Sequence, residues 1–264
     1  MPELPEVETV RRALAAVLPG RVIRQVEVFS PAMRTPLLPL LDAGLEGLKF
    51  TEVLRRGRYL RLMLSDGRGL LAHLGMSGVI RVERPDVPKR KHEHVFLHLD
   101  SDRIFRFECP RRFSVFEVGD FPELGPEPLS DEFDAAYFYR ASRGRRGALK
   151  PFLMDNQVVT GVGNIYATEA LWRAGLSPMR RPETLSRARC AELVDAVKSV
   201  LTEAIEAGGT TVHDYRHVDG SEGRFAVRLR MYGCEGSKCP RCGAVIRKKI
   251  IGGRGSCWCP KCQK

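Results

Sequence analysis

The N-terminus offers a nucleophile that few chains carry. The chain opens with Met1-Pro2-Glu3-Leu4-Pro5-Glu6, and removal of Met1, which is usual before a residue as small as proline, would leave Pro2 with a free secondary amine. An α-amino group titrates near pH 8, whereas lysine titrates near 10.4, so a usable fraction of such an amine is uncharged at neutral pH. An uncharged secondary amine can attack a sugar C1′ and form a cationic imine when a neighbouring base assists it.

Two carboxylates, Glu3 and Glu6, accompany this amine. One of them could protonate the sugar ring oxygen or a departing base, and the other could orient the amine. Acidic residues are also common in the first turn of a helix, where they cap the chain and face the positive end of the helix dipole. The local sequence leaves both roles open.

Four cysteines near the C-terminus have the spacing of a zinc site. They follow the pattern C-x2-C-x16-C-x2-C and are Cys239, Cys242, Cys259 and Cys262. Two such pairs can close a tetrahedron of thiolates around one Zn²⁺, and four protein ligands leave no open position for chemistry. We therefore expect one structural zinc ion. Cys257, two residues before a ligand, is either a bystander or an alternative ligand.

The positive charge of the chain is concentrated in its C-terminal half. The formal net charge is +11; residues 1–139 contain 20 basic and 21 acidic residues, whereas residues 140–264 contain 23 and 11. Between the cysteine pairs lies the basic run 247–254, which we expect to form a hairpin tip able to lie on a nucleic-acid duplex. A solubilising tail, or a zinc ribbon used for protein contacts, is the alternative.

A glycine-rich turn precedes a predicted helix in the middle of the chain. Gly161 and Gly163 stand shortly before an apolar helical pattern that begins at Asn164. Exposed N–H groups at such a helix start form an anion site, and the surrounding positive charge favours a DNA phosphate there. A tight turn between two helices, with Asn164 as the helix cap, is the alternative.

Two kinds of periodicity divide the chain into the elements that position these residues. A helix is expected from Pro5 to Leu18, and runs with the alternation of antiparallel strands follow at 22–29, 48–64, 69–83, 94–99 and 103–118. Beyond the turn-forming stretch 125–131 the pattern becomes helical, at 133–140, 147–156, 164–174, 186–207 and 210–216. We expect an α+β multidomain protein: an N-terminal antiparallel β-sandwich with a leading helix, a helical domain and a C-terminal zinc-finger hairpin.

The bulk composition indicates a soluble globular protein. The chain has 264 residues, of which 43% are hydrophobic and 28% charged, which is enough for two modest domains with cores of their own. No apolar stretch approaches the roughly 18 residues needed to cross a bilayer, and the N-terminus lacks the pattern of a signal peptide. These features argue against a membrane protein and predict a cytoplasmic one.

Several motifs, taken in order along the whole chain, resemble those of the formamidopyrimidine-DNA glycosylase family. They are the opening segment 1–9, His73-Leu74-Gly75-Met76-Ser77-Gly78, Pro110-Arg111-Arg112-Phe113, Leu153-Met154-Asp155-Asn156, the segment 161–167 and the four C-terminal cysteines. The opening segment resembles the branch of the family that acts on purine lesions, because relatives of the endonuclease VIII branch usually have glycine at the position of Leu4. The domains then expected are a catalytic β-sandwich at 1–130, a helix-two-turn-helix domain at 131–222 and a zinc finger at 223–264.

The resemblance implies catalytic roles for residues at both ends of the chain. Pro2 matches the Schiff-base nucleophile, Glu3 the proton donor for sugar-ring opening, and Glu6 the acid that supports the N-terminus. Arg254 matches a hairpin arginine that grips the phosphates of the lesion and assists elimination. Arg58 stands where the family usually has a lysine that contacts phosphate and takes part in β-elimination. Arginine keeps the phosphate contact, but with a pKa above 12 it cannot readily shuttle a proton.

The resemblance also implies a set of DNA contacts. Met76, Arg111 and Phe113 match three side chains that enter the duplex and fill the gap left by the everted nucleotide. A methionine or phenylalanine of unknown placement is otherwise most often a core residue. Three further residues match phosphate-contacting positions: His94, Arg145 and Asn164.

The function that the resemblance implies is base excision repair of duplex DNA. A bifunctional glycosylase and AP lyase would excise oxidised purines, such as 8-oxoguanine and formamidopyrimidines, and cleave the abasic strand by β,δ-elimination. It would need no cofactor beyond structural zinc, and would act as a monomer in the cytoplasm, associated with the nucleoid of a bacterium. Two alternatives are a non-catalytic zinc-ribbon protein that binds DNA and an enzyme of the pyrimidine-lesion branch.

Overall fold

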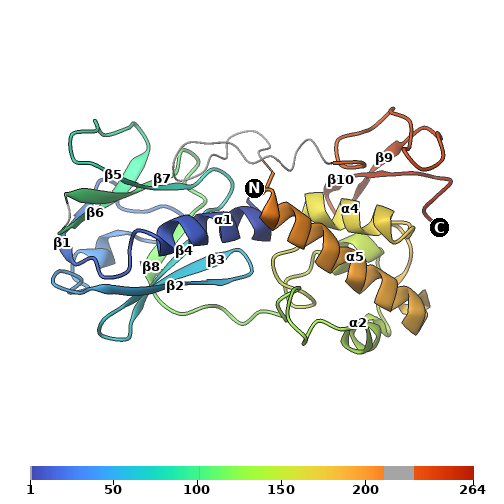
Figure 1. The fold of residues 1–264 in the computed structure, drawn as a ribbon, viewed down its shortest axis with the longest axis horizontal. Coiled ribbons are helices and arrows are strands. Elements are labelled where there is room, and N and C mark those ends of the chain that lie inside the picture. Colours follow the sequence, from blue (N-terminus) through green and yellow to red (C-terminus); the bar gives the residue numbers. More distant parts are fainter. Residues whose placement is uncertain (1, 101, 211–228) are drawn as a thin grey trace. The chain divides into compact units, whose positions relative to one another are not determined.

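The computed structural model describes residues 2–100, 102–210 and 229–264, drawn as ribbons in Figure 1. They fold as two compact units. Unit 1 consists of residues 1–122 and 208–224, and unit 2 of residues 123–207 and 225–264. The three domains expected at 1–130, 131–222 and 223–264 remain a prediction.

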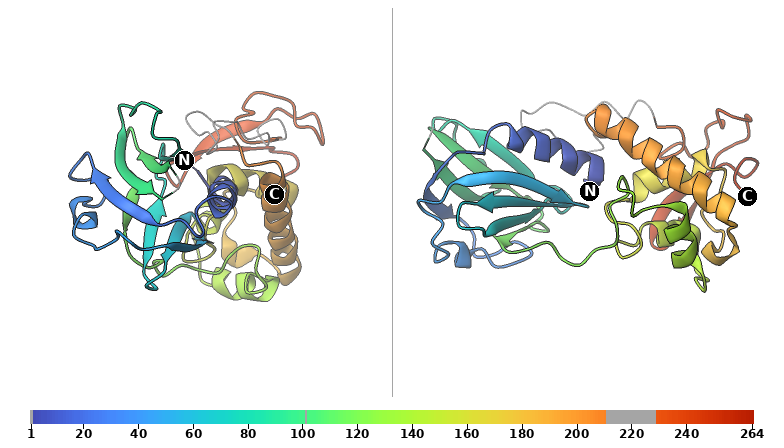
Figure 2. Two further views of the ribbon diagram at one scale, coloured as in Figure 1. Left: turned by 60° about the vertical axis from the view of Figure 1, so that its left-hand side comes forward. Right: turned by 60° about the horizontal axis from the view of Figure 1, so that its bottom comes forward.

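Unit 1 is a leading helix followed by two antiparallel sheets of four strands each. The helix α1 spans Leu4–Ala15 and contacts β2 (Figure 2). One sheet has the order β1 (Ile23–Val28), β6 (Glu93–Leu99), β7 (Arg103–Glu108) and β5 (Val79–Glu83). The other has the order β2 (Phe50–Arg56), β3 (Tyr59–Leu64), β4 (Gly69–His73) and β8 (Val115–Val118). The short 3₁₀ helix η1 spans Leu38–Leu40. The predicted sandwich with a leading helix is confirmed.

The core of unit 1 lies between the two sheets. Phe105 and Phe107 of β7 both pack against Phe116 of β8, with ring centroids 5.6 and 5.3 Å apart. Val7 and Leu14 of α1 are buried in the same cluster. Each such side chain contributes roughly 1.5–3 kcal/mol of transfer free energy when fully buried. Helical spacing of the apolar residues in α1 is therefore what fixes the N-terminus to the sheets.

Three of the predicted β-rich runs each contain two strands. The run 48–64 is the hairpin of β2 and β3, which turns at Gly57 with φ of +56°. The runs 69–83 and 103–118 are different, because β4 and β5 belong to opposite sheets, and so do β7 and β8. The loops 74–78 and 109–114 therefore carry the chain from one sheet to the other. Alternation along the sequence could not reveal these crossings, since it continues on both sides of them.

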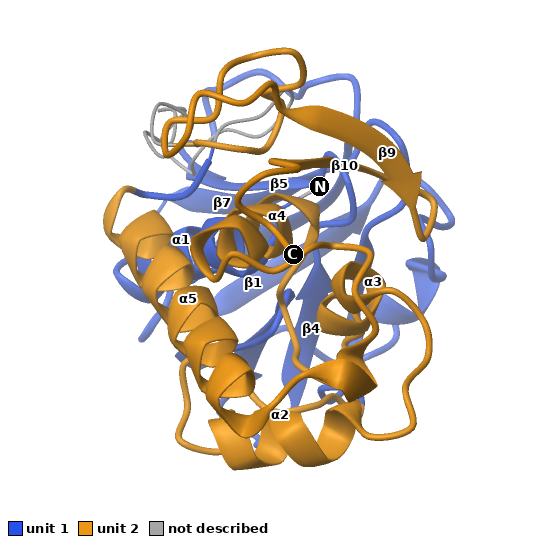
Figure 3. Cartoon of the chain, turned by 90° about the vertical axis from the view of Figure 1, so that its right-hand side faces the viewer, with its two compact units in different colours: residues 1–122, 208–224 blue, residues 123–207, 225–264 orange. Residues whose placement is uncertain are grey.

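Unit 2 consists of helices and a β-hairpin (Figure 3). Its helices are α2 (Ala135–Ser142), α3 (Leu149–Leu153), α4 (Asn164–Arg173), the 3₁₀ helix η2 (Pro182–Thr184) and α5 (Arg187–Glu206). Its hairpin pairs β9 (Arg247–Ile251) with β10 (Arg254–Trp258). The helix expected at 147–156 is shorter than predicted, and the one expected at 210–216 falls outside the described residues except for Thr210.

Candidate functional site

The N-terminal residues are buried at the start of α1. Glu3 and Glu6 expose only 3% and 2% of their surface, and Pro2 is buried beside them. Oε2 of Glu6 accepts the backbone N–H of Glu3 at 2.8 Å, and Oε1 accepts the N–H of Thr210 at 2.7 Å. A carboxylate that receives two backbone N–H groups is strongly held. Glu6 therefore fixes the backbone next to Pro2, and it is the N3 residue of a capping box whose N-cap is Glu3.

Gly209 makes this arrangement possible. Its φ is +78°, and a Cβ atom added there would lie 3.0 Å from Oε1 of Glu6. Any side chain at this position would press on the carboxylate and strain the backbone. The sequence holds the signal in the pair Gly208-Gly209, which the sequence-based prediction did not use.

Arg58 lies in the turn between β2 and β3, near His73, which begins one of the family motifs but was given no role of its own from the sequence. Tyr59 pairs with His73 across β3 and β4, and their rings are 4.7 Å apart. Burial, together with the charges of Arg58 and Arg34, lowers the pKa of His73 to about 4. Nδ1 of His73 accepts the N–H of Gly75 at 3.1 Å, so the neutral ring holds the start of the loop 74–78.

The two loops that cross between the sheets pack against each other. A Cβ atom at Gly75, whose φ is +60°, would lie 2.6 Å from the carbonyl oxygen of Phe113. The hydroxyl of Ser114 donates to the carbonyl of Leu74 at 2.9 Å, and a Cβ atom at Gly78 would lie 2.4 Å from both of these oxygens. Only glycine fits at 75 and 78, which explains why these residues occur in the motif.

This packing brings Met76, Arg111 and Phe113 together on two adjoining loops. Met76 and Phe113 expose 39% and 50% of their surface, although both are large and apolar. The Arg111 guanidinium lies 5.4 Å from the ring centroid of Phe113, within the range of a cation–π contact. The alternative that Met76 and Phe113 are core residues is therefore wrong. They form an apolar and cationic surface of the kind that a binding partner covers.

His94 is buried and faces the protein. Its surface is 5% exposed, and Nε2 donates to the carbonyl oxygen of Cys109 at 3.0 Å. This placement argues against a direct phosphate contact by His94, because its ring supports the start of the loop 109–114. His92, two residues earlier, is only half-buried and lies next to the exposed Lys91. The sequence analysis missed His92, since spacing alone could not decide which histidine reaches the surface.

In unit 2, a buried lysine holds the start of α4. Nζ of Lys150 donates to Oδ1 of Asn164 at 2.5 Å and to the hydroxyl of Ser256 at 2.8 Å, and only 1% of the Lys150 surface is exposed. The N-cap of α4 is Gly163, so the alternative interpretation, with Asn164 as the cap, is wrong. Lys150 was also missed from the sequence, where it stands in an apolar run. It ties α3, α4 and β10 into one positively charged site.

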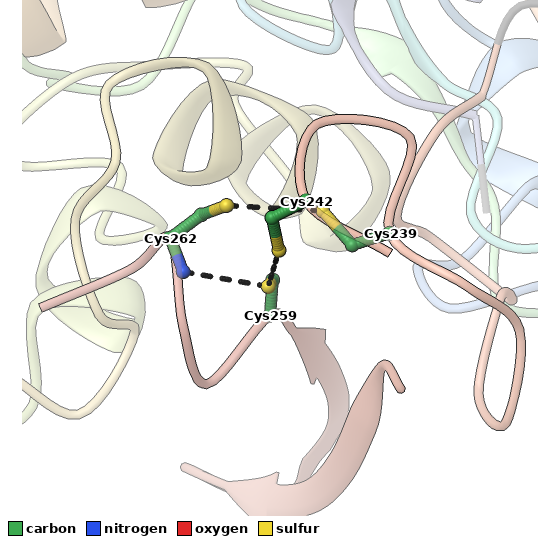
Figure 4. Close-up of side chains that lie close together, drawn as sticks. All are labelled: Cys239, Cys242, Cys259 and Cys262. Carbon is green, nitrogen blue, oxygen red and sulfur yellow. Dashed lines mark hydrogen bonds between the residues drawn. The ribbon is translucent and has the colours of Figure 1, made fainter. Parts of the chain in front are cut away.

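The four predicted cysteines meet in one cluster (Figure 4). Their sulfur atoms all lie within 4.8 Å of one another; two of the separations are 3.9 Å, from Cys239 to Cys262, and 3.4 Å, from Cys242 to Cys259. Zinc bound tetrahedrally at 2.3 Å from each sulfur places the sulfurs about 3.8 Å apart, so the cluster fits one structural Zn²⁺. Cys257 is not a member of the cluster; it is buried against the same small core.

The hairpin beside this cluster presents its basic residues to solvent. Arg247, Lys248 and Lys249 are exposed on β9, and Arg254 is exposed at the start of β10. Gly252 forms the turn with φ of +55°, and a Cβ atom there would lie 2.6 Å from Cγ of Pro151. The turn therefore rests on α3, which sets where Arg254 begins the second strand.

Arg145 lies in the exposed segment between α2 and α3. Its carbonyl oxygen accepts the N–H of Glu183 at 3.4 Å, so the backbone of this segment is hydrogen-bonded to η2. Across the described ranges, every helix is either too short or too polar to span a lipid bilayer.

Three family models match the chain. The model described as the formamidopyrimidine-DNA glycosylase N-terminal domain matches residues 1–116, the H2TH domain of the same glycosylase matches residues 124–216, and a zinc finger found in FPG and IleRS matches residues 236–264. These matches cover both units and follow the order of the predicted elements.

Curated relatives and solved structures agree with these models. The formamidopyrimidine-DNA glycosylases of Alcanivorax borkumensis and Syntrophotalea carbinolica are 46% and 47% identical to the chain, over the full length of each. Lactococcus lactis Fpg in a complex with DNA containing an abasic site has a TM-score of 0.91 at 34% identity and covers 99% of both chains. MutM with DNA containing carbocyclic 8-oxo-G has a TM-score of 0.91 at 35% identity and covers 100% of both. The chain therefore belongs to the formamidopyrimidine-DNA glycosylase family.

Proposed function

We propose that the chain is a bifunctional DNA glycosylase and AP lyase that removes oxidised purines, 8-oxoguanine and formamidopyrimidines, from duplex DNA. The observation that carries the proposal is the buried N-terminus, where Glu6 holds the backbone of Glu3 directly beside Pro2. The relatives named for formamidopyrimidine support the substrate class. Structures of relatives contain DNA with Fapy-dG, with carbocyclic 8-oxo-G or with an abasic site.

The chemistry begins at Pro2 after removal of Met1. The uncharged amine attacks C1′ of the damaged nucleotide, the bond from C1′ to the base breaks, and the base leaves with a proton. Glu3 donates a proton to the ring oxygen as the sugar opens, and the product is a cationic imine between Pro2 and C1′. Glu6 keeps the nitrogen in position through its bonds to the backbone.

The imine then makes strand cleavage possible. Its positive charge acidifies the 2′ hydrogens, so loss of one of them expels the 3′ phosphate, and a second elimination expels the 5′ phosphate. Hydrolysis of the imine returns free Pro2. Arg58 and Arg254 contact the phosphates in this scheme and neutralise their charge. Because arginine holds its proton so firmly, Arg58 binds phosphate and another group removes the proton.

The surface on the crossing loops serves to open the duplex. Met76, Arg111 and Phe113 enter the stack, and their contacts offset the few kcal/mol that eversion of a nucleotide costs. Arg111 faces the orphaned cytosine. Asn164, held by Lys150, and Arg145 contact phosphates, and His92 takes the role that the sequence analysis gave to His94. The zinc ion supports the hairpin and takes no part in the chemistry. The enzyme acts as a monomer, and its substrate places it in the cytoplasm, near the nucleoid.

Reductive trapping tests the proposal. Borohydride reduces the imine to a stable amine, so the wild-type protein should become covalently linked to duplex DNA that contains an abasic site or 8-oxoguanine. A Pro2→Thr variant should give no such adduct, and intact mass of the wild-type protein should show that Met1 is absent. Equal absence of the adduct in both proteins would overturn the proposal and favour a DNA-binding protein without catalysis. Faster excision of thymine glycol than of 8-oxoguanine would favour the pyrimidine-lesion branch.

A further inference from the structure

Two arginine-rich segments of unit 2 lie side by side. Residues 140–146 and 180–189 together contain eight arginines and a single acid, Glu183. The first segment begins in α2 and leads to α3, and the second contains η2 and the start of α5. In Figure 3, α2 lies beside the end of α5 at which that helix begins, and the two helices are in contact.

Arg143 holds the two segments together. Its guanidinium donates to the carbonyl oxygens of Glu183, Pro182 and Leu185, the last at 2.9 Å. Its Cζ also lies 4.1 Å from the ring centroid of Tyr139, and the guanidinium of Arg187 lies 5.2 Å from the same centroid. Arg143 thus has a structural role, and its bonds fix the positions of its neighbours.

The remaining arginines differ in their partners. Arg180 and Arg189 donate to backbone carbonyls and to side chains of unit 2. Arg140, in the last turn of α2, is exposed, and so are four arginines outside that helix: Arg145, Arg146, Arg181 and Arg187. We call these four the arginine surface. Within the described part of the chain, no acidic side chain forms an ion pair with any of them, and among their side chains only that of Arg187 contacts an aromatic ring, that of Tyr139.

A surface of this composition requires an anionic partner. Guanidinium groups bind phosphate through paired N–H donors. Arg143 holds the backbone of residues 182–185 against the segment 140–146, so the two groups of arginines stay on neighbouring segments. A DNA duplex carries one negative charge per about 1.7 Å, so it can meet several arginines at once. Arg145 is already assigned to a phosphate in the proposed function. The other three arginines lie on the same two segments, 140–146 and 180–189, and are exposed as Arg145 is.

We propose that the arginine surface binds phosphates of the duplex outside the lesion and so lengthens the footprint of the enzyme on DNA. The proposal rests on the proposed function for the presence of duplex DNA. It assigns Arg146, Arg181 and Arg187 to affinity and to sliding along undamaged DNA, with no part in the chemistry. Such contacts are independent of sequence and are sensitive to salt.

The test removes the positive charge of chosen arginines by changing them to glutamine, which is also polar. In one triple variant Arg146, Arg181 and Arg187 become glutamine; in the control variant three exposed arginines of unit 1, Arg21, Arg24 and Arg103, become glutamine, with the same change of net charge. Dissociation constants are measured against salt concentration on an abasic duplex of about three helical turns and on one of about one turn. A double variant, Arg146→Gln with Arg181→Gln, leaves the contact of Arg187 with Tyr139 intact.

The expected result is a weaker salt dependence of DNA binding. On the long duplex, the slope of log K against log salt should fall in magnitude by roughly 0.9 for each phosphate lost, or by about two to three for the triple variant. The control should keep the wild-type slope, and on the short duplex the triple variant should approach the wild-type protein. The proposal is overturned if the slope of the triple variant is unchanged, or if the slope of the control variant falls by the same amount. The arginine surface would then be a solvated face or a site for an acidic protein.

Trapping separates this proposal from the proposed function. At saturating protein, the triple variant should be trapped on abasic DNA as completely as the wild-type protein, because it keeps Pro2, Glu3 and Glu6. Normal trapping with normal salt dependence would refute the arginine surface alone. Loss of trapping by the wild-type protein would refute the proposed function alone.

Discussion

Oε2 of Glu6 accepts the backbone N–H of Glu3 at 2.8 Å, so one buried carboxylate fixes the residue next to Pro2. The second oxygen of Glu6 accepts the N–H of Thr210, far along the chain. The side chain therefore belongs to the capping box of α1, with Glu3 as the N-cap, and in the proposed function it also positions the nucleophile. A carboxylate that must receive two N–H donors at once is hard to replace.

Replacing Glu6 by glutamine should slow imine formation while leaving the fold intact. The amide of glutamine has one acceptor oxygen and one NH₂ donor, so one of the two backbone N–H groups would lose its partner. A hydrogen bond to a charged group is worth about 1.5–3 kcal/mol, which corresponds to a rate roughly 10- to 150-fold lower if the whole loss falls on positioning. Single-turnover trapping with borohydride measures this rate.

The control for this prediction is Glu52→Gln, a glutamate exposed on β2. It should be trapped at the wild-type rate. If Glu6→Gln and Glu52→Gln react equally fast, the backbone contacts of Glu6 do not position Pro2.

Lys150→Met should weaken DNA binding and destabilise unit 2. Nζ of Lys150 bridges Asn164 and Ser256, so its loss leaves the buried hydroxyl of Ser256 and the half-buried amide of Asn164 without that partner. We expect the free energy of unfolding to fall by about 1–3 kcal/mol, and duplex affinity to fall with it because Asn164 is no longer held. Ser256→Ala removes one of these contacts and should show a smaller effect on both. Denaturant unfolding and anisotropy on an abasic duplex supply the two measurements.

His73→Leu should loosen the loop that carries Met76. Nδ1 of His73 accepts the N–H of Gly75, and the low pKa of His73 keeps this acceptor available at neutral pH. Asparagine can place an oxygen where Nδ1 lies, so His73→Asn should retain the contact that leucine loses. A 2-aminopurine next to the lesion reports insertion into the stack; its fluorescence should change normally with His73→Asn and less with His73→Leu. Equal responses from both variants would contradict this role.

The parts of the site that could be predicted from the sequence are those set by local rules. The cysteine spacing predicted the four-sulfur cluster, and Pro5 with its apolar residues predicted α1, because zinc geometry and helical periodicity act over short distances. The residues that reach the surface on crossing loops were identified by resemblance alone. Their exposure depends on the packing of Gly75 against Phe113, which brings together two loops from different parts of the chain.

The residues that were missed depend on distant partners. Lys150 stands in an apolar run of the sequence, and it is buried because it donates a hydrogen bond to Ser256, over a hundred residues later. His94 and His92 are indistinguishable by spacing, and the choice between them depends on the carbonyl of Cys109 on another strand connection. A lysine is almost never fully buried unless it is paired, so sequence reasoning placed it on the surface by default.

The ion cluster around Glu8 should make unit 1 sensitive to acid. Burial raises the pKa of Glu8, but hydrogen bonds from Arg11, Arg55 and Arg12 outweigh this and lower it to about 2. A depressed pKa stabilises the fold above the ordinary value of 4.5, and this contribution is lost as the pH falls from about 4.5 to about 2. Screening by solvent reduces this contribution to roughly 2–3 kcal/mol, below what the full shift would give. Urea unfolding at pH 6 and pH 3 should therefore differ less in Glu8→Gln than in the wild-type protein; an equal difference would contradict the prediction.

Removal of zinc should unfold the hairpin and abolish duplex binding, and the chain contains its own reporter for this change. It has only two tryptophans. Trp172 packs against the cysteine cluster, and Trp258 ends β10 next to Cys259. A strong chelator should therefore shift the intrinsic fluorescence to longer wavelength as both rings meet water, and added Zn²⁺ should reverse the shift.

Metal analysis should find one zinc per chain in the wild-type protein and in Cys257→Ser, and none in Cys259→Ser, since four thiolates complete the coordination and Cys257 lies outside them. Loss of zinc from Cys257→Ser would contradict this prediction and show that Cys257 replaces one of the four cysteines as a zinc ligand.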